Sequence, residues 1–98
     1  MLYLLTEAAE RDVLDIYLYG YQAFGQQQAD IYHDVLEKTF EFLALNPYAG
    51  SKRPELDVRM MAEPIWIHPV RSHLVVYMIG NDKTVCIVRV RHAHEDWL

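Results

Sequence analysis

The clearest structural signal in the chain is the stretch LVVYMIGNDKTVCIVRV, residues 74–90. Both of its ends are rich in β-branched and aromatic residues, which favour strands. The link between them, residues 80–83, is Gly-Asn-Asp-Lys, which has the composition of a tight turn. The stretch therefore predicts an antiparallel hairpin with strands at 74–79 and 85–90.

Shorter signals on the N-terminal side predict two more strands. Residues 65–67, Ile-Trp-Ile, read as a third strand, followed by a second turn at 69–72. Residues 2–5, Leu-Tyr-Leu-Leu, are apolar and too few for a helix, so a first strand is expected there. The stretch at 47–54, PYAGSKRP, has the composition of a loop.

Two amphipathic helices are predicted between the first strand and this loop. The first starts after Thr6, a good N-cap, and stops at Gly25, a suitable residue to follow a helix. The second carries its apolar residues on one stripe and ends at Asn46-Pro47, because proline cannot continue a helix. Only a few residues around Gly25 separate the helices, so they should form an antiparallel hairpin.

The order strand, helix, helix, three strands predicts an α+β domain. In this arrangement the helical hairpin packs on one face of a mostly antiparallel four-stranded sheet. With 98 residues, the chain is expected to form a single domain over residues 1–98.

Composition argues against several classes of protein. Cys86 is the single cysteine, so no internal disulfide is possible and the reducing cytoplasm is the expected location. No apolar run approaches the roughly 20 residues of a membrane span. The formal net charge of -5 argues against direct sequence-specific nucleic-acid binding. The apolar fraction of 52% is rich for so small a domain, which indicates that some apolar surface meets a partner.

Three parts of the chain resemble the ParE toxins of bacterial toxin–antitoxin modules, within the RelE/ParE superfamily. They are LLTEAAERDVLDIYLYGYQAFG at 4–25, QADIYHDVLEKTFEFLALNPYAG at 28–50, and the pair SHLVVYMI at 72–79 and IVRVRHAHEDW at 87–97. The resemblance implies the fold predicted above. It leaves two activities open, because RelE-like members cut messenger RNA on the ribosome whereas ParE-like members poison DNA gyrase and are neutralised by a ParD-type antitoxin.

Strand periodicity bears on this choice. RNA cleavage needs a proton acceptor, cations that stabilise the phosphate, and an acid for the leaving oxygen. Alternation predicts that Arg89 and Arg91 share a face with Ile87, while the other face carries Cys86, Val88, Val90 and His92. The arginines are thus separated from His92, and we expect no catalytic centre. The ordinary alternative for both arginines is a solvated or ion-paired strand face.

We expect the cations of the sheet half and the C-terminal end to bind partners. The predicted partner-binding residues are Arg59, Arg71, Arg89, Arg91, His92, His94 and Trp97. Arg89 and His92 match the Arg-Val/Ile-Leu-His ending of the family, whereas Arg91 stands where the family usually has leucine. His68 or Asp96 could complete a metal site with His92-x-His94, but neither is fixed as a third ligand, so no metal or other cofactor is expected.

The function predicted from the resemblance is that of a toxin which inhibits DNA gyrase by binding. A ParD-like antitoxin would neutralise it through a disordered C-terminal segment that folds on the toxin, chiefly through apolar contacts. Two alternatives remain open at this point. One is a RelE-like ribosome-dependent endoribonuclease, and the other is a non-toxic family member that only binds an antitoxin.

Overall fold

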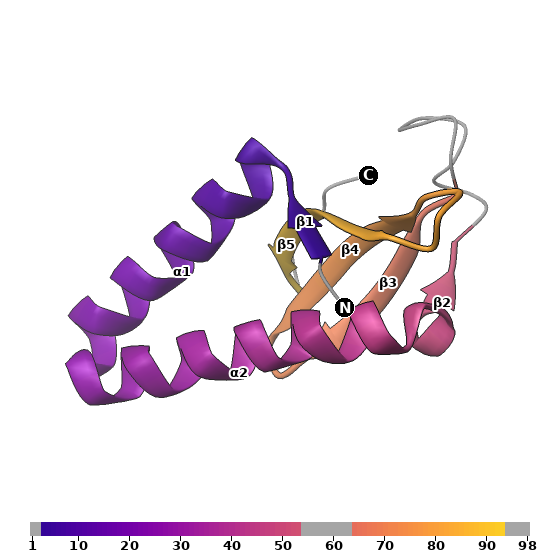
Figure 1. The fold of residues 1–98 in the computed structure, drawn as a ribbon. Helices are drawn as coiled ribbons and strands as arrows, with labels where there is room; N and C mark the ends of the chain where they lie inside the picture. Colours follow the sequence, from indigo (N-terminus) through magenta and orange to yellow (C-terminus); the bar gives the residue numbers. More distant parts are fainter. Residues whose placement is uncertain (1–2, 54–63, 94–98) are drawn as a thin grey trace.

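The structure, a computed structural model, describes residues 3–53 and 64–93. Its elements are β1 (Tyr3–Leu5), α1 (Glu7–Phe24), α2 (Gln26–Leu45), a short 3-10 helix (Pro47–Ala49), β2 (Ser51–Lys52), β3 (Trp66–Val70), β4 (His73–Ile79) and β5 (Val85–His92). Figure 1 shows α1 and α2 as a hairpin whose connecting end extends well beyond the sheet.

The strands form one sheet in the order β1-β5-β4-β3-β2. β1 runs parallel to β5, and the other pairs are antiparallel. The predicted α+β fold is therefore confirmed, with one addition. Ser51 and Lys52 pair with β3 as a fifth strand inside the predicted loop. A strand of two residues is too short to show any periodicity in a sequence.

β3 also continues through Pro69, which was predicted to lie in a turn. Proline is tolerated there because β2 pairs only with Trp66 and Ile67 of β3. The nitrogen of Pro69 therefore needs no partner on that side. The turn that follows is correspondingly tight, since Val70 and His73 are paired across it.

Both predicted ends of α1 are confirmed. The Thr6 side-chain oxygen accepts a hydrogen bond from the Ala9 amide at 3.0 Å and donates one to the Val88 carbonyl at 2.7 Å. Gly25 has a φ of 92°, which favours glycine, and it separates α1 from α2. Thr6 thus fixes the start of the helical hairpin against β5.

Buried side chains form two clusters, one on each face of the sheet. On the helix side, Leu36 and Phe40 of α2 pack with Tyr77 and Ile87 of the sheet. The second cluster comprises Ile65, Ile67, Val76 and Val88. Both faces of the central strands are therefore apolar.

A β-bulge in β5 overturns the predicted distribution of faces. Tyr77 of β4 pairs with Ile87, but Val76 pairs with Arg89, so Val88 is an extra residue. Beyond a bulge, the alternation of a strand is displaced by one residue. Ile87 and Val90 consequently both belong to the helix-side cluster, and Val88 belongs to the other. The prediction that Val88 and Val90 share a face, and that Arg89 shares one with Ile87, is wrong.

Tyr77 anchors the segment that follows α2. Its buried hydroxyl donates a hydrogen bond to the Pro47 carbonyl at 2.7 Å and accepts one from the Gly50 amide at 3.0 Å. A Cβ on Gly50 would lie 2.6 Å from this hydroxyl and 2.8 Å from the Ile67 carbonyl. The Pro-x-x-Gly pattern of the sequence is thus explained by two backbone groups that converge on one tyrosine.

Asp12 of α1 closes the edge of β5 beyond the end of β1. Its carboxylate accepts hydrogen bonds from Arg89 Nε at 2.7 Å, from Arg89 Nη2 at 3.0 Å and from the Val90 amide at 2.9 Å. A carboxylate that occupies an otherwise free strand edge satisfies the backbone and blocks pairing with another strand. Arg89 is therefore held by α1.

Tyr77→Phe should lower the free energy of unfolding by about 1–3 kcal/mol, because it leaves the Pro47 carbonyl and the Gly50 amide without this partner. Urea denaturation followed by circular dichroism measures the change. Tyr48→Phe is the matched control, since the Tyr48 ring is exposed. Equal stability of the two variants would contradict the anchoring role of Tyr77.

Asp12→Ala should lower the free energy of unfolding by roughly 2 kcal/mol, because hydrogen bonds to an ionised group are lost. The comparison is Asp34→Ala, which removes only an exposed pair with Lys38 and should cost at most about 0.5 kcal/mol. The same denaturation experiment compares both variants. A loss no larger for Asp12→Ala than for Asp34→Ala would show that the contact with β5 adds no stability.

Candidate functional site

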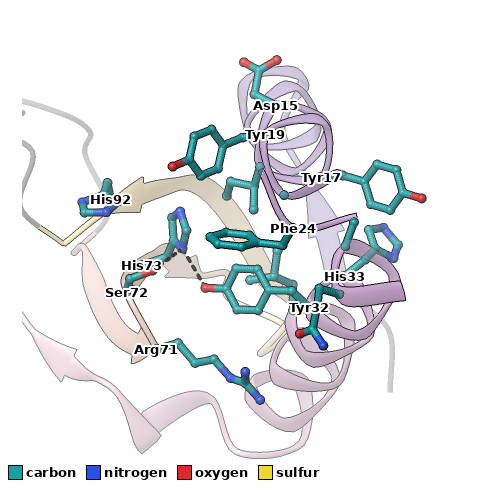
Figure 2. A pocket seen from close by; sticks show the side chains of 15 residues that line it. Asp15, Tyr17, Tyr19, Phe24, Tyr32, His33, Arg71, Ser72, His73 and His92 are labelled. Carbon is teal, nitrogen blue, oxygen red and sulfur yellow. Dashed lines mark hydrogen bonds between the residues drawn. The ribbon is translucent and has the colours of Figure 1, made fainter. Parts of the chain in front are cut away.

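A groove of about 520 Å³ lies between the helical hairpin and one end of the sheet. Figure 2 shows Phe24, Tyr32 and His73 at its centre. The helices contribute mainly apolar and aromatic side chains to its wall. The sheet contributes a polar edge made by Arg71, Ser72, His73 and His92.

The apolar wall exists because the hairpin extends beyond the sheet. Tyr19 and Phe24 of α1 remain 67% and 68% exposed, and their ring centroids are 6.3 Å apart. Neighbouring exposed aromatic rings at the mouth of a groove are typical of surfaces that bind another protein. The groove therefore has the character of a docking site for apolar side chains.

The polar edge is a connected cluster. The Tyr32 hydroxyl lies 2.7 Å from His73 Nδ1 and 3.2 Å from the Val70 carbonyl. The His73 and His92 rings meet almost at right angles, with centroids 5.4 Å apart. Burial raises the pKa of Tyr32, an effect that its contact with Ser72 and the charge of Arg71 oppose. The Tyr32 hydroxyl thus links α2 to His73 and to the Val70 carbonyl.

Arg71 occupies a strained position in the turn between β3 and β4. Its φ is 53°, a left-handed conformation that costs a residue other than glycine about 1–2 kcal/mol. Its guanidinium carbon lies 5.7 Å from the centroid of the Tyr32 ring. Backbone strain of this kind is concentrated at ligand-binding sites. Among the described residues that line the groove, Arg71 is the one lysine or arginine.

The structure separates the predicted partner-binding residues. Arg71 and His92 line the groove. Arg89 and Arg91 are in register with Val76 and Leu74, which belong to the cluster on the sheet face away from the helices. Arg89 and Arg91 therefore lie on the opposite face of β5 from His92. Partner binding by these four residues remains a prediction.

Three predicted partner-binding residues, Arg59, His94 and Trp97, lie outside the described residues.

Sequence reasoning did not single out Tyr32, Ser72 or His73 as site residues. Without a bulge, the register that begins with Ile79 opposite Val85 would place His73 opposite Arg91. The extra residue at Val88 pairs His73 with His92 instead. The predicted turn at 69–72 could have drawn attention to Ser72 and His73. The pairing of His73 with His92 depends on the register of β4 against β5, which the sequence does not display.

The described ranges, residues 3–53 and 64–93, show neither a metal site nor a helix that could span a membrane. In these ranges no three His, Cys, Asp or Glu side chains come together as a metal site. His68, considered as a third ligand, contacts the Phe42 ring at a centroid distance of 5.8 Å. Neither helix in the same ranges has the length and apolar content needed to cross a bilayer.

Comparison with known proteins identifies the family. A family model described as the ParE toxin of type II toxin-antitoxin system, parDE, matches residues 3–97. A structure described as the chromosomal ParDE TA system from P. aeruginosa has the same fold, with a TM-score of 0.76 and 17% sequence identity over 96% of this chain and 97% of that chain. No curated protein sequence shows significant similarity. Because the family match spans nearly the whole chain, the protein belongs to the ParE toxin family of type II toxin–antitoxin systems.

Proposed function

We propose that this toxin arrests growth by binding DNA gyrase, without a catalytic centre of its own, and acts in the cytoplasm. A ParD-like antitoxin neutralises it by docking in the groove. Membership of the ParE toxin family carries the first part of the proposal. The groove, with its exposed aromatic wall, supports the second.

The arrangement of the last strand favours binding over catalysis. Cleavage of RNA requires a base, an acid and cations around one phosphate. Arg89 is occupied by the Asp12 carboxylate, which accepts from two of its nitrogens. Arg91 is in register with Leu74 on the other side of the sheet from His92. The two arginines of β5 therefore do not converge with its histidine.

One observation favours a second candidate, the ribosome-dependent endoribonuclease. Arg71, His73 and His92 line the same groove, and an imidazole pair beside a guanidinium can provide acid, base and charge. However, the imidazoles contact each other, and His73 is hydrogen-bonded to Tyr32. The opposite wall of the groove is aromatic and apolar, which suits a peptide better than a phosphate chain.

The same groove suits an amphipathic antitoxin helix. Large apolar side chains of such a helix would cover Tyr19 and Phe24, and a carboxylate would reach Arg71. The formal net charge of the toxin is -5, so attraction of an acidic partner over the whole molecule is not available. Apolar burial must therefore provide most of the affinity, with Arg71 giving local complementarity.

The toxin should trap gyrase on cleaved DNA and leave messenger RNA intact. Purified toxin incubated with gyrase, ATP and plasmid should increase the linear DNA released by detergent and protease. Primer extension in a translating extract tests the alternative. Cuts in messenger RNA at the ribosomal A site would establish the endoribonuclease, and absence of growth arrest in cells that express the toxin alone would establish the non-toxic member.

Phe24→Asp should abolish neutralisation of a growth-arresting toxin by the antitoxin encoded beside it. Charge in the aromatic wall should raise the dissociation constant by roughly 30-fold or more, about 2 kcal/mol. Growth rescue and isothermal titration calorimetry measure the effect. Leu45→Asp is the control, because Leu45 is as exposed as Phe24 and does not line the groove. Equal affinities of the two variants would exclude the groove as the docking site.

A further inference from the structure

α1 carries a second apolar surface, separate from the groove. Leu14, Leu18 and Tyr21 are 54%, 48% and 49% exposed, and none of them lines the groove. Their spacing of four and then three residues places them on one stripe of the helix. By helical geometry this stripe faces away from Ala9 and Ile16, which pack against the core. We call Leu14, Leu18 and Tyr21 the outer stripe.

The rest of α1 is also poorly covered. Ala9 is the one fully buried residue of α1, whereas α2 buries five residues. A helix that is apolar on opposite sides is normally covered on both sides. The groove accounts for one side of α1. On the other side, the outer stripe leaves apolar area exposed.

Charge along α1 indicates how a second helix would run. All of its charged residues lie in the first half, and residues 16–24 contain none. They are Glu7, Glu10, Arg11, Asp12 and Asp15. A parallel pair of identical helices would bring the acidic halves together, which is unfavourable. An antiparallel pair places each acidic half beside an uncharged, aromatic half.

The register of such a pair is self-complementary. With a two-fold axis at the level of Ile16, Leu14 of each chain lies opposite Leu18 of the other chain. Arg11 then lies opposite Tyr21 of the other chain, where a guanidinium can stack on the ring. The positions 11, 14, 18 and 21 follow the alternating spacing of three and four residues found in helix pairs. A two-fold interface requires this kind of match of one surface with itself.

From this match we propose that a second copy of the toxin docks on the outer stripe, with α1 antiparallel to α1 about a two-fold axis. Only one helix from each chain takes part, so the interface is smaller than that of a permanent dimer and the association is weak. The outer stripe does not line the groove, so the dimer interface and the groove use different residues of α1. The inference is independent of the target proposed above.

Sedimentation equilibrium across the micromolar range tests for the dimer. The toxin should associate reversibly, and Leu14→Glu/Leu18→Glu should be monomeric at every concentration. Leu45→Glu, at a more exposed leucine at the end of α2, should associate like the unchanged chain. Circular dichroism confirms that each variant is folded. A monomeric unchanged chain, or a double variant that still dimerises, would overturn the proposal.

Cysteine cross-linking tests the direction of the pair, in a Cys86→Ala background that removes the native thiol. Under mild oxidation, a mixture of Leu14→Cys and Leu18→Cys chains should form mixed disulfide dimers faster than either chain forms them alone. Disulfides require close approach of the two residues, so this preference reports the antiparallel register. Preferential pairing of Leu14→Cys with itself would indicate a parallel pair and reject the proposed interface.

Discussion

The extra residue at Val88 in β5 is the constraint on which the rest of the site depends. It displaces the alternation of the strand, so that Val90 packs beneath the helices. It also brings His92 opposite His73 at the edge of the groove. Without the bulge, the arginines and histidine at the end of β5 would exchange faces. One inserted residue therefore determines which side chain of β5 lines the groove.

Thr6 and Asp12 attach the start of α1 to the bulged part of β5. Thr6 donates to the Val88 carbonyl, and Asp12 accepts from the Val90 amide, so the first turns of α1 follow the bulged strand. β1 pairs with β5 only as far as Ile87, and side chains of α1 contact the edge beyond it.

The overhanging hairpin combines two physical roles. The second half of α2 supplies the buried side chains Leu36, Phe40 and Leu43, which hold the domain together. The connecting end of the hairpin contributes Phe24 and Tyr19 to the surface, where their apolar area is left in water. Exposed apolar area of this kind favours association. The second half of α2 thus packs the core, while the connecting end of the hairpin offers exposed apolar area to a partner.

Much of the fold followed from local features that a sequence displays directly. The strand-forming runs, the Thr6 cap, the stop at Gly25 and the proline after α2 act within a few residues of chain, so each could be read in isolation. The family resemblance rested on the same features, and the match over residues 3–97 confirms it. The same local reading named Arg71 and His92, which line the groove, and partner binding by them stays a prediction.

What the amino-acid order alone determined was therefore the identity and succession of the elements. The tertiary structure decided the faces of β5, the ion pair of Arg89 with Asp12, and the meeting of Tyr32, His73 and His92. The physical reason is that a bulge changes register without a distinctive local composition. Contacts between residues distant in the chain exist only after strands and helices have packed together.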